Sequence, residues 1–318
     1  MRSGLDMTRK KLKRARDRYT LEDLQQWRER THDVRPPIRL GILGDPVTHS
    51  FSPDIHNAAL KQEKIDMQYA AFEVSPNELA RALKFVRELD FIGVNLTVPH
   101  KIAAIESVDE VDPAARKIGA INVVANRSGK LVGFNTDGLG FSRAIREEFA
   151  VDLRDLRVML LGAGGGGRAI AMQCALENCE RLVLANRTFD TAKELADRLS
   201  EFFAGPKVLG PVPRLQAIPW EESALRFQIA NIDLIVNATP VGLNRTDPPP
   251  LPEHLLAPHL LVYDTVYRPD RTQFVAAAAG AGARAANGLS MLLHQGALAF
   301  QIWFERAAPI DTMRAALL

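Results

Sequence analysis

Two serines stand two residues apart, directly before a helix that the sequence predicts over residues 53–62. In an extended chain, side chains at positions i and i+2 face the same way, so Ser50 and Ser52 could hold one anion beside the helix N-terminus. Helix capping alone would explain Ser52 but would leave Ser50 without a role. We therefore expect an anion-binding turn at this point of the chain.

More polar residues would meet this turn if the predicted strands lie side by side. Thr97 and Lys101 follow an apolar run over residues 91–96, while Asn122 and Asp137 stand in two later segments that contain glycine. Sheets of alternating strands and helices bind ligands at the carboxyl ends of their strands. Taken singly, Lys101 could be an ordinary surface lysine and Asn122 a turn residue, so the pattern counts only as a group.

A glycine-rich turn predicts a dinucleotide site in the second half of the chain. The apolar run 157–161 leads into a G-x-G-x-x-G pattern, and a helix candidate follows it. The first glycine permits a tight turn, the second lets the backbone approach a pyrophosphate, and the third lets helix and strand pack closely. The helix N-terminus then offers N–H donors and a partial positive charge to the phosphates. The predicted contacts are Gly162, Ala163, Gly164, Gly165 and Gly167.

The end of the next strand candidate favours NADP over NAD. NAD enzymes usually carry a carboxylate about 20 residues after the glycines, where it bonds the ribose 2′-hydroxyl. Here the strand candidate is followed by Asn186, Arg187 and Thr188. A guanidinium suits a 2′-phosphate, and the missing carboxylate removes a repulsion. The nearest carboxylate, Asp190, is expected on the following helix.

These residues would be positioned by an α/β fold of two units, each a parallel sheet covered by helices, because strand and helix patterns alternate. In the first unit we expect strands at 38–43, 68–74, 91–96, 120–125 and 131–134, with helices at 53–62, 78–88 and 137–149. The helix at 78–88 should carry Leu79, Leu83 and Val86 on one apolar face. In the second we expect strands at 157–161, 181–185, 232–237, 260–263 and 284–286, with helices at 165–177 and 191–203. The chain then closes with two helices, at 289–305 and 310–317.

The composition is that of a folded globular chain, with 47% hydrophobic and 25% charged residues among 318. The net charge of +2 is uneven, because the first 37 residues hold 11 basic and 6 acidic side chains. The remainder is slightly acidic and has no bulk positive field for nucleic acid. The basic run over residues 9–18 could be a nucleic-acid or membrane arm, but we expect a solvated tail with one short docked helix after Thr20.

Several classes of protein are not expected. No window approaches the roughly 18 consecutive apolar residues of a membrane span, and no apolar stretch of a secretory signal follows the N-terminal basic residues. Cys174 and Cys179 fit neither a disulfide framework nor a metal-ligand spacing, so no metal is expected. We expect a cytoplasmic protein with a small-molecule substrate and no nucleic-acid or membrane partner, either a monomer or a homodimer.

Taken together, these segments resemble the shikimate dehydrogenase family in order, spacing and residue types, from about residue 38 to residue 304. The segments 237–242, 264–269 and 287–295 add to the resemblance. This family reversibly reduces 3-dehydroshikimate to shikimate with NADPH, on the chorismate route to aromatic amino acids. The resemblance implies an N-terminal α/β substrate-binding domain, a Rossmann-like dinucleotide-binding domain, and C-terminal helices that return to the first domain.

The resemblance also assigns roles to single residues. Lys101 and Asp137 would be the catalytic pair, with Lys101 handling the proton of the reacting hydroxyl and Asp137 positioning that lysine. Burial would favour a neutral lysine and the neighbouring aspartate a charged one, and the sequence leaves this balance open. Ser50 and Ser52 would hold the substrate carboxylate, while Thr97, Asn122 and Gln295 would bond the ring hydroxyls and Tyr267 would line the pocket. Further cofactor contacts would come from Thr239, Thr265, Gly288 and Met291.

The basic N-terminal extension over 1–37 is not a usual part of the family. For the remainder, the resemblance implies a substrate-binding domain over 38–137 and 288–318, and an NADP-binding domain over 138–287. Two alternatives remain open. A quinate/shikimate dehydrogenase that uses NAD would carry an acidic residue near the adenosine ribose. A non-catalytic nucleotide-binding sensor on the same fold would have lost the lysine and aspartate pair.

Overall fold

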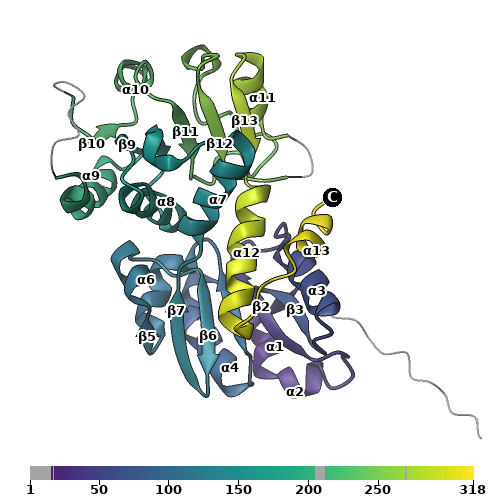
Figure 1. The fold of residues 1–318 in the computed structure, drawn as a ribbon. Helices are drawn as coiled ribbons and strands as arrows, with labels where there is room; N and C mark the ends of the chain where they lie inside the picture. The colour runs from purple at the N-terminus through teal and green to yellow at the C-terminus, as the bar shows by residue number, and fades with distance from the viewer. Residues whose placement is uncertain (1–15, 17, 205–211, 269–270) are drawn as a thin grey trace, which may run out of the picture.

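Two β-sheets occupy the two halves of the molecule, one above the other in Figure 1. The computed structural model describes residues 16, 18–204, 212–268 and 271–318. The basic run that we noted over residues 9–18 falls almost wholly outside the described residues. The two-unit α/β architecture predicted from the alternating pattern is confirmed.

Within the described residues, seven strands form the first sheet, in the order β1-β3-β2-β4-β6-β7-β5. This sheet is mixed, whereas we expected it to be parallel: β6 pairs antiparallel with both β4 and β7. Ser128 and Gly129 have φ of 55° and 88° and form the two-residue turn of a hairpin, which makes its two strands antiparallel. The strand expected over 120–125 begins only at Val123. In chain order the strands are β1 (Tyr19–Thr20), β2 (Ile38–Gly44), β3 (Gln68–Glu73), β4 (Gly93–Leu96), β5 (Glu110–Val111), β6 (Val123–Arg127) and β7 (Lys130–Phe134).

Six described strands form the second sheet, all parallel, in the order β10-β9-β8-β11-β12-β13. The chain moves outward from β8 in both directions, so the strand order reverses between β8 and β11, and sheets of this kind bind ligands at the carboxyl ends of such strands. Strand β10 was missed by the sequence prediction. The strands are β8 (Arg157–Leu161), β9 (Arg181–Asn186), β10 (Leu215–Pro219), β11 (Leu234–Asn237), β12 (Leu261–Asp264) and β13 (Arg284–Asn287).

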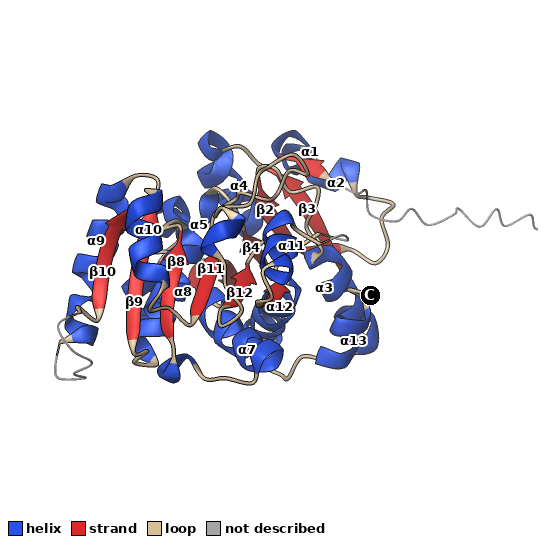
Figure 2. Cartoon of the chain, turned by 90° about the horizontal axis from the view of Figure 1, so that it is seen from above, coloured by secondary structure: helices blue, strands red, loops and turns tan. Residues whose placement is uncertain are grey.

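Helices cover both faces of the second sheet (Figure 2). Alternate residues of β8 enter different cores: Val158 and Leu160 pack with one set of helices, and Met159 and Leu161 with the other. Both faces of a parallel strand are therefore buried, as an unbroken apolar run predicts. One core includes α7 (Asp137–Phe149), α8 (Gly165–Leu176) and α9 (Phe189–Leu199), and the other includes α10 (Glu222–Ile229) and α11 (Gln273–Gly280).

The first sheet also lies between helices. The face of Leu79, Leu83 and Val86 that we expected to be apolar is buried, in a helix that follows a short 3₁₀ turn at Pro76–Glu78. The helices of this half are α3 (Ser52–Gln62), α4 (Leu79–Glu88), α5 (His100–Ala103), α6 (Pro113–Ile118) and α13 (Ile310–Ala315).

Two helices tie the halves together. Helix α12 (Leu289–Phe304) runs from the second half down to the first, and α7 packs along it (Figure 1). The helices approach closely at Gly140, where a Cβ atom would lie 2.9 Å from the backbone nitrogen of Gln295. Met291 packs in a core of the second half, whereas Phe300 and Trp303 pack in a core of the first.

The N-terminal segment is more structured than the docked tail that we expected. Strand β1 pairs with the edge strand β3, and two short helices follow, α1 (Leu21–Gln25) and α2 (Trp27–Arg30). The predicted start after Thr20 is confirmed, because Thr20 and Asp23 form a capping box. Tyr19 and Trp27 are buried against Phe72 at ring-centroid distances of 5.6 Å each. This segment is therefore part of the core of the first half.

Candidate active site

A buried ion pair lies between the two sheets. Lys101, on α5 just beyond β4, places its Nζ 2.6 Å from Oδ2 of Asp137, the first residue of α7. The aspartate side chain is 3% exposed and the lysine side chain 18%. An ion pair this far from water keeps its geometry, because a buried charge that loses its partner is strongly unfavourable.

Asn122 connects this pair to two more side chains. Its Nδ2 lies 2.8 Å from Asp137 Oδ1, 2.9 Å from Thr136 Oγ1 and 3.2 Å from Gln295 Oε1. The backbone nitrogen of Thr136 donates to Asn122 Oδ1 at 2.7 Å, which fixes the orientation of the amide. The structure thus brings together Lys101, Asn122, Asp137 and Gln295, which are far apart in the sequence.

The two serines meet in a way that differs from our expectation. The chain between them is not extended, because Phe51 has φ −86° and ψ 6°. Ser52 is the first residue of α3 and is buried, and its backbone nitrogen donates to Ser50 Oγ at 3.2 Å. A tight turn at the helix N-terminus, rather than strand alternation, therefore brings the Ser50 hydroxyl to the backbone of Ser52.

Tyr267 reaches this turn from the second half of the molecule. Its ring lies 5.6 Å from that of Phe51, and burial raises the pKa of the Tyr267 phenol. Thr97, half-buried at the end of β4, packs its methyl group against Gly44 at the end of β2. Both predicted residues thus lie at strand ends that face the space between the sheets.

Three polar residues of this region were not among the predicted contacts. Tyr69 and Asn95 are buried, and the Tyr69 hydroxyl donates to Asn95 Oδ1 at 2.8 Å. Thr136 bonds Asn122, as described above. An asparagine inside the apolar run 91–96 was the available signal, because a buried polar side chain needs a partner.

The glycine turn has the geometry of a phosphate cradle. Gly162 has φ +106°, and a Cβ on Gly167 would lie 2.2 Å from the Gly162 carbonyl oxygen, so both positions require glycine. No atom lies within 4 Å of a Cβ built on Gly164 or Gly166, so this side of the turn is open. Helix α8 begins at Gly165 and aims its free N–H groups at that opening.

The ion pair and the glycine turn touch one another. A Cβ built on Gly165 would lie 2.7 Å from Lys101 Cβ, so the lysine stem packs directly on the start of α8. The residue expected to move a proton therefore stands beside the turn expected to hold a dinucleotide. We regard this contact as the central feature of the site.

At the end of β9, Asn186 Oδ1 accepts from the Ala163 nitrogen at 3.1 Å and so braces the glycine turn. Arg187 and Thr188 follow it and are exposed. Arg187 has no ion pair among the residues that the structure describes. Asp190 lies within α9, as expected, and no carboxylate follows β9 directly.

The other four predicted cofactor contacts lie where β11, β12 and β13 end. Thr239 Oγ1 donates to Asn237 Oδ1 at 2.7 Å, and the Thr265 nitrogen donates to the Asn237 carbonyl at 2.9 Å. A Cβ on Gly288 would lie 2.2 Å from the Thr265 carbonyl oxygen. The Met291 nitrogen donates to the buried Tyr263 hydroxyl at 3.1 Å.

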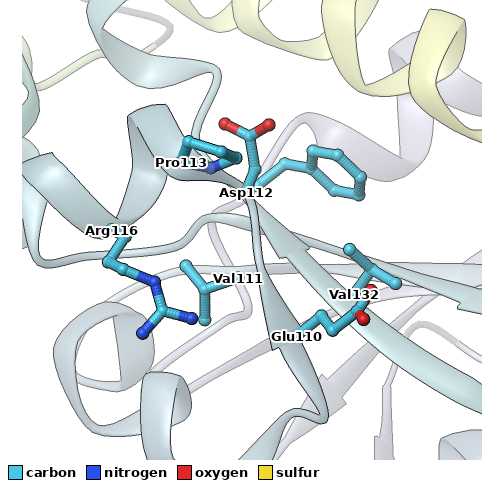
Figure 3. A pocket seen from close by; sticks show the side chains of 7 residues that line it. Glu110, Val111, Asp112, Pro113, Arg116 and Val132 are labelled. Carbon is cyan, nitrogen blue, oxygen red and sulfur yellow. The ribbon is translucent and has the colours of Figure 1, made fainter.

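Other features do not compete with this site. The described residues contain no group of three or more His, Cys, Asp or Glu side chains that could hold a metal, and no described helix is long and apolar enough to cross a membrane. A surface hollow of about 400 Å³ lies beside β5 and α6 (Figure 3). None of the predicted substrate or cofactor residues lines it; its lining is Glu110, Val111, Asp112, Pro113, Arg116, Val132 and Phe134.

Comparison with protein families matches three family descriptions in chain order. Residues 42–124 match the shikimate dehydrogenase substrate binding domain, residues 144–208 match shikimate / quinate 5-dehydrogenase, and residues 288–318 match the shikimate 5'-dehydrogenase C-terminal domain.

Whole-length relatives agree. The shikimate dehydrogenase (NADP(+)) of Methanopyrus kandleri is 42% identical over 281 residues, which is 88% of this chain and 94% of the relative. That of Symbiobacterium thermophilum is 43% identical over 293 residues, or 91% and 97%. The crystal structure of shikimate 5-dehydrogenase from Thermus thermophilus in complex with NADP(H) and shikimate matches with a TM-score of 0.75 and 37% identity, covering 88% of this chain and 98% of that one.

Proposed function

The chain belongs to the shikimate dehydrogenase family and is an NADP-dependent oxidoreductase that reduces 3-dehydroshikimate in the shikimate pathway, and we propose that Lys101 and Asp137 handle the proton of that reaction. The observation that supports this proposal is the buried ion pair packed on the glycine turn. If the proposed roles hold, one proton carrier would stand beside both the substrate site and the cofactor site.

The pair can do two things for the substrate. Lys101 Nζ can give a proton to the carbonyl oxygen during reduction and take it back during oxidation. Asp137 holds that nitrogen in place through Oδ2, while its Oδ1 is held by Asn122. The aspartate is thus positioned before the substrate arrives, which reduces the reorganisation needed in the transition state.

The remaining predicted residues would orient the ring. Ser50 and Ser52 would bind the carboxylate at the N-terminus of α3, where the helix adds partial positive charge. Thr97, Asn122 and Gln295 would bond the hydroxyls, and Tyr267 would close the pocket over the serine turn. The contact of Tyr267 with Phe51 supports this placement, because it joins the two halves at the serine turn.

The cofactor site fits NADP(H). Bound NADPH supplies the hydride. The open side of the glycine turn and the start of α8 would hold the pyrophosphate, and Arg187 would hold the 2′-phosphate. Asn186, Thr188, Thr239, Thr265, Gly288 and Met291 would complete the site around these anchors.

We assign residues 38–137 and 288–318 to the substrate-binding domain and 138–287 to the NADP-binding domain, with 1–37 as an extension. We also propose a cytoplasmic monomer or homodimer without nucleic-acid or membrane partners, since the chain after residue 37 is slightly acidic. Light scattering during gel filtration would measure the oligomeric state. A filter-binding assay with the full chain and with residues 1–15 deleted, which keeps the packed segment from Tyr19 onward, would test for nucleic acid.

The direct test of the proposed function is a two-by-two rate measurement. Purified protein is given shikimate or quinate with NADP or NAD, and the formation of reduced nicotinamide is followed. We expect fast reduction only for shikimate with NADP. Comparable rates with quinate and NAD would make this a broader quinate/shikimate dehydrogenase, and nucleotide binding without any turnover would favour the sensor.

A further inference from the structure

Asn135 is a half-buried asparagine between β7 and α7 to which the proposed mechanism gives no role. Its Oδ1 accepts from the Asp137 backbone nitrogen at 3.0 Å, and its Nδ2 donates to the Ala120 carbonyl at 2.9 Å. One side chain therefore bonds both the backbone of Asp137 and the backbone of the segment that leads into Asn122.

These bonds lie where the chain turns from a strand into a helix. At the end of the hairpin, the Asn122 nitrogen still donates to the Phe134 carbonyl at 2.9 Å, as in a strand ladder. Helix α7 then begins, and the first N–H groups of a helix have no partner within it. Asn122 Oδ1 accepts from the Thr136 nitrogen at 2.7 Å, and Asn135 Oδ1 accepts from that of Asp137. Two asparagine side chains thus hold the start of α7 on the hairpin.

An asparagine suits both bonds at position 135. An amide offers an acceptor and a donor, whereas a carboxylate offers acceptors alone. An aspartate here could accept from the Asp137 nitrogen, but it would face the Ala120 carbonyl with an oxygen and add a negative charge near Asp137. The residue type therefore matches the two backbone groups that it joins.

The same segment also touches the proposed proton carrier. The Ile121 nitrogen donates to the Lys101 carbonyl at 2.8 Å, and Asn122 Nδ2 donates to Asp137 Oδ1 at 2.8 Å. The backbones on the two sides of the ion pair are thus joined through this segment and Asn135. The 2.6 Å contact between Lys101 Nζ and Asp137 Oδ2 is therefore made from two backbones that are fixed relative to one another.

We propose that Asn135 is a positioning residue for the ion pair, which holds the backbone of Asp137 at a fixed place relative to Asn122 and Lys101. The proposal rests on the roles proposed above for Lys101 and Asp137. A backbone fixed in this way reduces the reorganisation needed when the proton is transferred.

Asn135→Ala removes both bonds. We expect kcat with shikimate and NADP to fall about tenfold, because small misplacements of reacting groups lower rates by up to about a hundredfold, while the KM for NADP stays within about twofold. Asn135→Ser is the conservative variant, because a serine hydroxyl can accept from the backbone nitrogen two residues on, and it should recover part of the lost kcat.

Asn126→Ala is the matched control. Asn126 is a half-buried asparagine of β6 with the same pattern of bonds, since its Oδ1 accepts from the Gly129 nitrogen at 2.8 Å and its Nδ2 donates to the Val86 carbonyl at 3.4 Å. Both alanine variants should lower the melting temperature, but only Asn135→Ala should lower kcat. An equal fall of kcat in the two would overturn the proposal. A kcat of Asn135→Ala within about twofold of the parent chain, or a serine variant no faster than the alanine variant, would also overturn it.

A double-mutant cycle with Lys101→Gln tests whether Asn135 acts through the ion pair. If it does, adding Asn135→Ala to Lys101→Gln should lower kcat by no more than about a further twofold. A further fall as large as in the parent chain would overturn the proposal. If Lys101→Gln itself leaves kcat unchanged, the proposed role of Lys101 has failed instead, and with it the basis of this inference.

Discussion

At the scale of single residues, the candidate site depends on hydrogen bonds that satisfy its buried polar groups. Asp137 is almost fully buried, yet each of its oxygens has a partner, Lys101 on one and Asn122 on the other. A carboxylate in this state keeps its place only while both partners remain. The residues that we propose for proton transfer and substrate binding, Lys101 and Asn122, are therefore also the residues that hold the Asp137 carboxylate.

His56 is the opposite case, because it is a buried titratable group that has no charged partner among the described residues and stays neutral. Burial lowers its pKa from 6.5 to about 3, and it stacks on Tyr69 as a neutral ring. In the unfolded chain the imidazole takes up a proton below about pH 6.5, whereas in the folded chain it does so only near pH 3. Between about pH 6.5 and pH 3 the unfolded chain therefore binds a proton that the folded chain does not, and the free energy of unfolding falls as the pH falls.

We expect this histidine alone to remove about 1.4 kcal/mol of unfolding free energy per pH unit below roughly pH 6, down to about pH 3. His56→Phe keeps an aromatic ring without the titration. Urea unfolding at pH 7 and at pH 5 should show a smaller loss for the variant than for the parent chain. Identical losses would contradict the predicted role of His56.

We propose that Arg187 gives the enzyme its preference for NADP over NAD. Arg187→Ala should raise the KM for NADP about tenfold or more, as expected for hydrogen bonds to a charged group, and leave the KM for NAD nearly unchanged. The control is Arg226→Ala, an exposed arginine of α10 that pairs with Glu222. An equal rise in the KM for NADP and the KM for NAD would show that Arg187 supports the cofactor site without binding the 2′-phosphate.

At the scale of elements, the sequence predicts most of what local patterns determine. Helix α7 and strand β8 begin and end where their patterns predict, and α4 buries the expected face. Pairing direction was the failure: the antiparallel hairpin depends on two residues with positive φ, Ser128 and Gly129, and a short turn gives a weak signal beside long apolar runs.

The candidate site shows the same contrast between features that lie in one short segment and contacts between distant segments. Motifs located the serine turn, Lys101 and the glycine turn, because each lies in one short segment. Tyr69 was missed because its partners come from other strands and no local pattern marks it. The serines were found for a reason that the structure corrects, since a turn rather than extended chain brings them together.

The N-terminal segment is the element whose role the sequence underestimated. Trp27→Ala should lower the unfolding free energy by about 3–5 kcal/mol, because the indole packs against Phe72 and Phe91 in a core of the first half. Arg30→Ala, exposed on the same helix, is the control. Chemical denaturation would measure both, and equal stability of the two variants would mean that the segment is only loosely docked.

At the scale of the whole molecule, two sheets meet at a few contacts between their halves. Helices α7 and α12 join them, Tyr267 contacts the serine turn, and Lys101 packs on Gly165. Such contacts assemble the site only when the halves are close, so binding and catalysis should depend on their spacing.

Gly165→Ala tests that spacing. The new methyl group would lie 2.7 Å from Lys101 Cβ, an atom so near the backbone that one half must shift. Because small misplacements of reacting groups lower rates by up to about a hundredfold, we expect kcat to fall at least roughly tenfold. Gly166→Ala is the matched control in the same helix, since its Cβ meets nothing within 4 Å. An equal fall in both variants would point to the helix rather than to the contact.

Above all, we propose that Lys101 transfers the proton while Asp137 holds the lysine in position. The most direct measurement is the steady-state rate of Lys101→Gln with shikimate and NADP, since glutamine can still donate to Asp137 but cannot carry a proton. Lys84→Gln, an exposed lysine paired with Glu88, is the control. We predict that kcat falls about a hundredfold or more while the KM for NADP stays unchanged. A kcat close to that of the parent chain would contradict the claim.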